Sequence, residues 1–371
     1  MRIIFLLITV IHGLIHLLGF VKAFNYSEVK QLIQPITKPF GLIWLVSATL
    51  FLVVALLFFQ RNNNWWLIGF IAIVFSQILV FCFWSDAKFG TIANFIILIG
   101  CIIGYATWNY YNKYESDIKL GLQQKEYFDK SIITEKDIEH LPEPVRKYLR
   151  YTGCVGKPKV NNFKLEFNGK IRKDEQSQWM PFTSEQYNFL QTPTRLFFMK
   201  AIMKHLPVAG YHRYGNGKAF MDIRLFSLLK VQFLEGEEMN KAETVTFFND
   251  MCCMAPATLI DKRISWQVTG ENRIKANFTT NGISITADLF FNEVGELINF
   301  KSNDRYNADA GKNLPWATPL RDYKEVNGYK LARYAKTIYS YPDKDLCYGT
   351  FEVSSVKYNC KPTEQMKNDS H

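Results

Sequence analysis

The sequence predicts an α+β protein in which a four-helix transmembrane region precedes a mostly antiparallel, curved β-sheet domain covered by one long helix. Residues 1–110 hold long apolar runs and carry only six Lys/Arg and two Asp/Glu. Residues 111–371 carry 38 Lys/Arg and 32 Asp/Glu. In the second part, apolar residues recur with period two in short segments joined by turn residues, which is typical of antiparallel sheets. We expect a transmembrane domain at 1–110, a polar helical stalk at 111–140, a β-rich soluble domain at 141–360 and a flexible tail at 361–371.

The overall composition excludes several protein classes. With 48% hydrophobic, 15% aromatic and 21% charged residues, the chain is neither disordered nor collagen-like. Seven cysteines without a C-x-x-C spacing argue against a disulfide framework and a zinc site. The net charge of +10 is interleaved with acidic residues, so we expect a solvated surface near anionic lipid and no nucleic-acid partner.

Four apolar runs fit the thickness of a bilayer. Each has about 17–20 residues, which as a helix crosses about 30 Å of hydrocarbon. The runs are Ile3–Val21, Leu42–Phe59, Trp66–Trp84 and Ile92–Trp108. The first lacks a small-x-small cleavage site before Lys22, so we interpret it as a retained helix rather than a signal peptide. The chain is therefore expected in the cell membrane as a multi-pass protein, with membrane lipid as a partner.

Two intramembrane histidines are candidate functional residues. His12 and His16 are four residues apart and share one face of the first helix. The pair could ligate haem or a metal, or relay protons. Alternatively, it forms interhelical hydrogen bonds, for which Gln77 and Asn94 are the strong polar partners.

The soluble part begins with a short helix, Glu143–Thr152. After it, the recurrence of apolar residues changes to period two. A longer helix, Glu237–Ala255, interrupts the strands, and Asn281-Gly282 and Asn327-Gly328 indicate two-residue hairpins. The sheet must bury one face, and this helix is the obvious cover. The enclosed interior is either filled by aromatic side chains or open to an apolar ligand. The expected strands are Phe163–Asn168, Trp179–Leu190, Arg195–Lys204, Tyr211–Tyr214, Ala219–Leu225, Leu228–Leu234, Ile264–Thr269, Arg273–Thr280, Ile283–Asn292, Leu297–Asp304, Arg321–Val326, Tyr329–Tyr341 and Tyr348–Tyr358.

A set of short motifs resembles a known family over Leu141–Asn359. The motifs are Leu141-Pro142-Glu143-Pro144-Val145, Gly156-Lys157-Pro158, Trp179-Met180-Pro181-Phe182-Thr183, Gly236-Glu237, Pro256-Ala257-Thr258-Leu259 and Asp322-Tyr323-Lys324-Glu325-Val326-Asn327-Gly328. In this order they resemble DUF6544 (DUF6920-like), a family of uncharacterised bacterial proteins. The strand pattern is similar to that of periplasmic lipoprotein carriers, which have a half-barrel and a helical lid. The chain departs from the family at Cys252-Cys253-Met254-Ala255, where the family has an aromatic residue.

No catalytic motif is present, so we assign no catalytic residue, no metal ligand and no cofactor. The leading hypothesis is a non-enzymatic module that binds an apolar or lipid-like small molecule. Its candidate ligand-binding residues are Trp179, His212, Arg213, Trp316, Asp322 and Tyr323. Trp316 lies between two prolines and is expected in a rigid loop at the mouth of the sheet. The alternatives are an enzyme acting on a membrane-associated substrate through His212, Arg213 or Asp322, and a membrane sensor.

Overall fold

The computed structural model describes residues 2–123 and 128–362, so most of the expected tail at 361–371 and part of the expected stalk lie outside the described residues. Residue contacts divide the chain into two compact units. The helical unit comprises residues 1–112 with 226–228, and the β unit comprises residues 113–225 with the chain from 229 onward. Each unit is described by itself.

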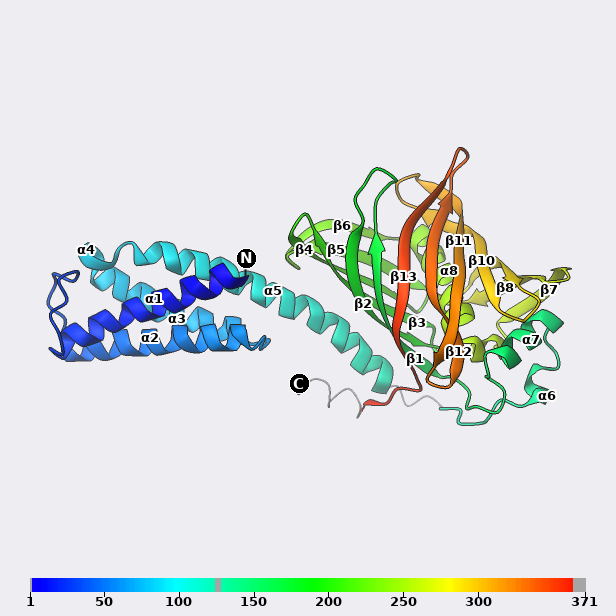
Figure 1. Ribbon diagram of the computed structural model, residues 1–371, viewed down its shortest axis with the longest axis horizontal. Coiled ribbons are helices and arrows are strands. Elements are labelled where there is room, and N and C mark those ends of the chain that lie inside the picture. The colour runs from blue at the N-terminus through cyan, green and yellow to red at the C-terminus, as the bar shows by residue number, and fades with distance from the viewer. Residues whose placement is uncertain (1, 124–127, 363–371) are drawn as a thin grey trace. The chain divides into compact units, whose positions relative to one another are not determined.

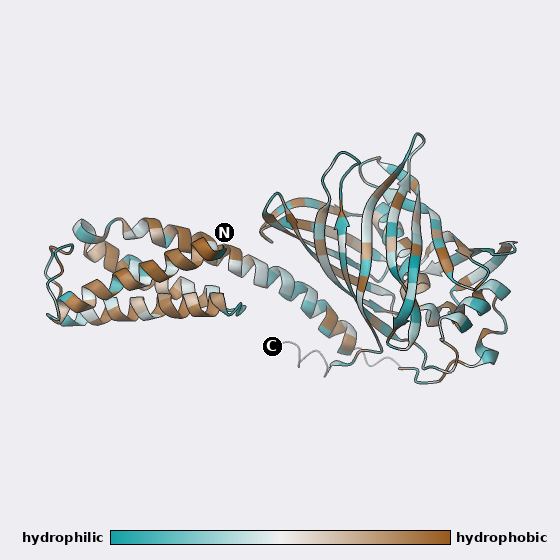
Figure 2. Ribbon diagram, in the orientation of Figure 1, coloured by the Kyte–Doolittle hydropathy of each residue, from teal (hydrophilic) through white to brown (hydrophobic). Residues whose placement is uncertain are grey.

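The helical unit contains the four predicted apolar helices, each long and apolar enough to cross a membrane. They are α1 (Arg2–Ala23), α2 (Lys38–Phe59), α3 (Trp65–Cys82) and α5 (Gly90–Gln123), and a short helix α4 (Trp84–Ala87) lies between the last two. Figure 2 shows hydrophobic residues along these helices. Glycines let the helices approach closely, because a Cβ on Gly19 would lie 2.2 Å from the Trp44 ring.

The β unit holds a single antiparallel sheet whose order is β6-β5-β4-β3-β2-β1-β13-β12-β11-β10-β9-β8-β7. Each sequence-predicted strand falls on an observed one, and the predicted class is confirmed. The strands are β1 (Asn162–Ile171), β2 (Met180–Phe189), β3 (Thr194–Met203), β4 (Leu206–Gly215), β5 (Lys218–Leu225), β6 (Leu229–Glu235), β7 (Ile264–Gly270), β8 (Arg273–Thr280), β9 (Ile283–Phe291), β10 (Leu297–Asn307), β11 (Lys312–Val326), β12 (Tyr329–Ser340) and β13 (Asp345–Tyr358). The helices are α6 (Glu135–Ile138), α7 (Glu143–Tyr151), α8 (Glu237–Met254) and the 3₁₀ turn η1 (Pro256–Ile260).

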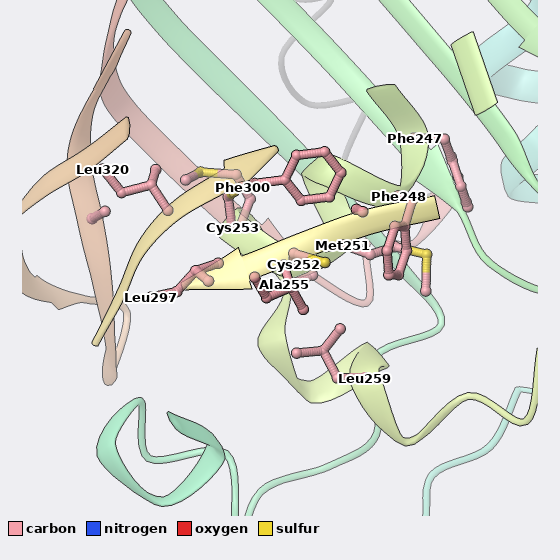
Figure 3. Packing of buried hydrophobic residues seen from close by; sticks show 14 of the residues in the cluster. Phe247, Phe248, Met251, Cys252, Cys253, Ala255, Leu259, Leu297, Phe300 and Leu320 are labelled. Carbon is pink, nitrogen blue, oxygen red and sulfur yellow. The ribbon is translucent and has the colours of Figure 1, made fainter. Parts of the chain in front are cut away.

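Helix α8 packs against one face of the curved sheet, which we call the inner face (Figure 1). Every residue of α8 from Ala242 to Met254 is buried, so the helix is enclosed on all sides. Phe248 stacks on Phe278 of β8 with ring centroids 5.1 Å apart and meets Phe300 of β10 edge-on. Figure 3 shows part of the hydrophobic core to which these rings belong, with Phe248 and Phe300 among the labelled residues.

The last three turns of α5 pack on the opposite, outer face of the sheet. Tyr114 and Ile118 are buried, and the Tyr114 ring contacts Phe198 of β3 at 5.3 Å. A Cβ on Gly121 would lie 2.5 Å from the Phe189 ring, so the helix lies close to β2. The helical part of the expected stalk is therefore the end of α5, whose residues 113–123 belong to the β unit and pack on its sheet. Residues 128–134 are not helical, and Ile132 forms a β-bridge with Pro158.

The sequence predicts a loop around Trp316, and the structure corrects this prediction. Leu314–Pro319 lies inside β11, and Trp316 is buried on the inner face. The prolines are tolerated because both stand where the ladder is interrupted. Pro315 lies opposite a bulge in β10, and the pairing of β11 with β12 skips Pro319.

Candidate functional site

The structure separates the sequence-predicted site residues. His212 and Trp316 both face the inner side of the sheet, because Phe197 pairs with His212 and Phe300 contacts Trp316. Arg213 follows His212 on β4 and therefore points to the outer face, where its Nε lies 3.2 Å from Asp117 Oδ2 of α5.

The contacts described for the other three candidates include neither His212 nor Trp316. Trp179 precedes β2 and is covered by the Arg172 guanidinium, 4.6 Å from its ring. Asp322 is exposed and pairs with Lys324 at 3.1 Å. The Tyr323 hydroxyl donates a hydrogen bond to the Leu297 carbonyl, and burial raises its pKa. Because His212, Arg213 and Asp322 do not converge, they form no catalytic group together.

A buried ionic network joins α8 to β2 and β3, and the sequence analysis did not find it. Arg195 of β3 donates to Glu243 at 3.0 Å and to Asp250 at 2.8 Å, and all three side chains are buried. Gln186 of β2 donates to Asp250 at 2.6 Å and accepts from Arg195 at 2.9 Å. Burial alone would raise the pKa of Glu243, but Arg195 lowers it below its ordinary value. This network fixes α8 on the inner face.

A second arginine, Arg305 of β10, faces the same interior without a carboxylate partner among the described residues. Its Nη1 donates to the Ala242 carbonyl at 3.1 Å and to Thr246 Oγ1, and its Nε is buried without an acceptor. The guanidinium lies 4.6 Å from the centre of the Trp316 ring. Burial lowers the pKa of Arg305, but Tyr339 and neighbouring groups raise it overall, so the side chain remains charged. Arg305 thus carries a positive charge inside the sheet that no described carboxylate contacts directly, although Glu243 contributes to raising its pKa.

A β-bulge explains why sequence reasoning missed Arg305. Alternation along β10 from Phe300 through Ser302 would place Arg305 on the outer face. The register shift between Ser302 and Arg305 inserts an extra residue and turns Arg305 inward. Its neighbour there is His212, whose pKa burial lowers to about 4, so the imidazole is neutral at neutral pH.

Apolar side chains of the inner face near these groups stay partly exposed. They come from the strands that α8 does not fully cover and pack on the edge of the core cluster. We name this set the inner-face patch: Ile171, Met180, Met221, Leu234, Tyr348 and Phe351. Trp316 Nε1 donates to the Tyr348 hydroxyl at 3.1 Å, which links the patch to Arg305 through the Trp316 ring.

In the helical unit, His12 and His16 belong to a buried polar network. Asn94 donates from Nδ2 to Gln77 Oε1 at 3.0 Å, so its Oδ1 accepts from His12 Nε2 at 2.9 Å. His16 Nδ1 donates to the His12 carbonyl at 2.8 Å, which leaves Nε2 to accept from Ser76 Oγ at 2.9 Å. Three helices, α1, α3 and α5, are thereby joined. Among the described residues, no group of three or more His, Cys, Asp or Glu side chains is arranged to hold a metal ion.

The comparison with protein families decides the classification. The model of DUF6544, a family of unknown function, matches residues 131–351. The chain belongs to this family. Among curated proteins, none matches the chain.

The solved structures that match the chain share very little sequence with it and have low TM-scores. A putative outer membrane lipoprotein-sorting protein domain from Vibrio parahaemolyticus has 9% identity and a TM-score of 0.35, covering 56% of this chain and 90% of that one. A LolA superfamily protein from Nitrosomonas europaea has 8% identity and a TM-score of 0.35, covering 63% and 97%. A DUF1329 family protein from Desulfovibrio piger has 9% identity and a TM-score of 0.35, covering 58% and 92%.

Proposed function

We propose that the β unit binds an amphiphile whose apolar chain lies on the inner-face patch and whose anionic group pairs with Arg305. The observation that carries this proposal is the Arg305 guanidinium, which is charged, has a buried Nε without an acceptor, and has no carboxylate partner among the described residues. An arginine in such surroundings gains about 1.5–3 kcal/mol from each charged hydrogen bond that it forms. A carboxylate or phosphate can supply two such bonds at once.

The surroundings of Arg305 favour an amphiphile over a small polar anion. Met221, Tyr348 and Phe351 of the inner-face patch are partly exposed. Burial of this apolar surface by the chain of an amphiphile contributes roughly 25 cal/mol of binding free energy per Å². His212, neutral beside Arg305, can donate a hydrogen bond, and no described residue accepts one from either of its ring nitrogens.

The proposal includes a membrane source for the ligand. In this proposal the chain is a multi-pass protein of the cell membrane whose first helix is retained, which is supported by four helices that are long and apolar enough to cross a membrane. An amphiphile in the adjacent leaflet is then the most concentrated ligand available to the β unit.

The test uses the full chain purified in a non-ionic detergent. Extraction followed by mass spectrometry is expected to release an anionic amphiphile from the wild-type protein, and Arg305→Gln is expected to lose at least tenfold of it. Arg273→Gln is the matched control, because Arg273 pairs with Asp288 on the protein surface. Binding of cis-parinaric acid, compared with a long-chain amine and a phosphatidic acid, distinguishes a free fatty acid from a phospholipid as the source of the anion.

A second pair of variants tests the apolar part. Gly210 lies on the inner face, where a Cβ would meet Met199 and Ile223 at ordinary distances of 3.7–3.8 Å. Gly210→Ala is therefore expected to fold and bind, whereas the much larger side chain of Gly210→Trp is expected to block the patch. Equal ligand content in wild type, Arg305→Gln and Gly210→Trp would refute the proposal.

A sensor function is the second candidate. The last turns of α5 contact the sheet through Asp117, which accepts from Tyr211 and Arg213, and the fourth apolar segment lies earlier in the same helix. Ligand binding on the inner face could change this contact across the thickness of the sheet. The test is amide hydrogen exchange of residues 113–123 with and without bound cis-parinaric acid: a change in protection supports signalling, and unchanged protection contradicts it.

A further inference from the structure

A trough runs along β11 on the outer face of the sheet, opposite to the inner-face patch. Trp316 faces inward, so its neighbours Pro315 and Ala317 face outward, as does Pro319 two residues further on. These three short side chains form the floor of a cavity of about 290 Å³, which we name the outer-face trough. Ala317 is only 9% exposed, because longer side chains of β10 and β12 stand on either side of it.

Two walls enclose this floor. The wall on β10 consists of Asn299, Lys301 and Asn303, and the wall on β12 of Ile338 and Ser340. In the ladders Lys301 lies opposite Ala317, and Ala317 lies opposite Ile338. The walls therefore stand two strand spacings apart, about 9.6 Å, which leaves the width of one extended chain between them.

The polar groups of the walls are available to a ligand. Among the described residues, the side chains of Lys301, Asn303 and Ser340 have no hydrogen-bond or ion-pair partner. Asn299 Oδ1 is buried without a donor. An asparagine amide offers both an acceptor and two donors, so the wall on β10 can bind either half of a peptide group.

The spacing of these groups matches that of an extended peptide. Residues two apart on a strand lie about 6.7 Å from each other, and the N–H and C=O groups on one side of an extended chain recur at the same distance. These backbone groups point sideways, toward the walls, when the side chains of the peptide point toward and away from the floor. Asn299 and Asn303 can therefore each meet the backbone of one such chain. The floor from Pro315 to Pro319 is about 13 Å long, which accommodates about four or five residues.

The charge around the trough favours an acidic peptide. Lys275 of β8 and Lys301 of β10 lie on either side of Asp288 in the ladder. Arg273 pairs with Asp288 at 3.0 Å, whereas neither lysine has a carboxylate within ion-pair distance in the described part of the chain. The other acidic residue of the lining, Asp345, lies on β13, beyond the wall on β12. The side of the trough next to β10 thus has an excess of positive charge.

We propose that the outer-face trough binds an extended acidic peptide segment of a partner protein. The peptide lies along β11 with small side chains toward the floor and carboxylates within reach of Lys301 and Lys275. The favoured sequence alternates small and acidic residues, because alternate side chains of an extended chain point to opposite sides. The inference is independent of the inner-face ligand and of the membrane embedding, since every group that it uses belongs to the outer face of the sheet.

The test is titration of the full chain, purified in a non-ionic detergent, with the peptide acetyl-Ala-Glu-Ala-Glu-Ala-amide. Saturation-transfer difference NMR measures the dissociation constant. We expect saturable binding of this peptide and at least tenfold weaker binding of acetyl-Ala-Lys-Ala-Lys-Ala-amide, of the acidic peptide N-methylated at its backbone, and of free glutamate. Absence of binding by the acidic peptide, or equal binding by any of the three comparison ligands, would overturn the proposal.

Variants of the protein locate the site. Lys301→Glu reverses the central charge of the wall and is expected to weaken binding at least tenfold, with an unchanged melting temperature because Lys301 is exposed. Lys357→Glu is the matched control, because Lys357 is also exposed, lies near the opposite end of β13 from Asp345 and does not line the trough. Ala317→Leu raises the floor and is expected to block binding. Unchanged binding in Lys301→Glu and Ala317→Leu, or an equal loss in Lys357→Glu, would refute the assignment to the trough.

Discussion

Tyr211 of β4 donates a hydrogen bond of 2.6 Å to Asp117 of α5, on the face of the sheet opposite α8. Arg213, two residues further along β4, donates to the same carboxylate oxygen. These contacts and the Tyr114 ring against Tyr211 and Phe198 attach α5 to the sheet. The last three turns of α5, which belong to the β unit, are thus held on the sheet by specific contacts.

Replacing Asp117 with Ala is expected to loosen this attachment. The change leaves Tyr211 and Arg213 without their acceptor, and a hydrogen bond to a charged group contributes about 1.5–3 kcal/mol. Amide exchange of residues 113–123 should therefore accelerate by at least tenfold. Asp345→Ala is the control, because Asp345 is exposed, and it should leave these exchange rates unchanged. Equal exchange rates in Asp117→Ala and wild type would contradict the role of the Asp117 contact.

Arg195→Met is expected to destabilise the β unit strongly. It leaves Glu243 and Asp250 buried without their cation, which costs about 3–5 kcal/mol. Arg273→Met removes a surface pair with Asp288 and should cost under about 1 kcal/mol. Urea unfolding of both variants, followed by the fluorescence of the β unit, measures the difference, and similar midpoints would refute the buried network as an anchor of α8.

The stability of the β unit is expected to fall as the pH falls from about 6.5 to about 4. Burial lowers the pKa of His212 to about 4, whereas an unfolded histidine titrates near 6.5. Between these values the unfolded chain binds the additional proton, so stability rises with pH across this window and acid removes it. The charged groups that face His212 are Arg195, Glu243 and Arg305. His212→Gln should flatten the dependence of the melting temperature on pH between 4 and 6.5, and an unchanged slope would exclude His212 as its source.

Asn94→Leu is expected to destabilise the helical unit. Its side chain accepts from His12 and donates to Gln77, so its loss breaks the network at its centre. Interhelical hydrogen bonds of this kind contribute about 0.6–2 kcal/mol each. The midpoint temperature of thermal unfolding in detergent should therefore fall for Asn94→Leu and not for Thr49→Val, because the Thr49 hydroxyl donates to the Leu45 carbonyl of its own helix.

The parts of the fold that follow from local patterns were predictable from the sequence. Period two, the Asn-Gly turns and the apolar runs placed the strands, α8 and the four apolar helices. The buried network was not predictable, because Arg195 meets Glu243 and Asp250 only when α8 packs across strands that precede it by about 50 residues.

At two other positions the sequence pattern predicted the wrong local structure. Pro315 and Pro319 indicated a loop around Trp316, but interruptions of the ladder accommodate both in β11. A bulge turns Arg305 to the inner face, whereas the alternation of side chains along β10 predicts the outer face. The sequence therefore did not reveal the charge on which the proposed function rests. Bulges depend on the pairing of two strands, and one strand's sequence does not reveal them.

The strand order has a consequence for assembly of the sheet. Every neighbouring pair is consecutive in the chain except β1 with β13. Two meanders, β1–β6 and β7–β13, can therefore each form from short-range hairpins, and a single distant seam, about 190 residues apart in the chain, then unites them. Closure of this seam is expected to be the slow event during refolding, and removal of β13 would leave two half-sheets joined by α8 and by a few contacts such as that of Arg263 with the Leu190 carbonyl.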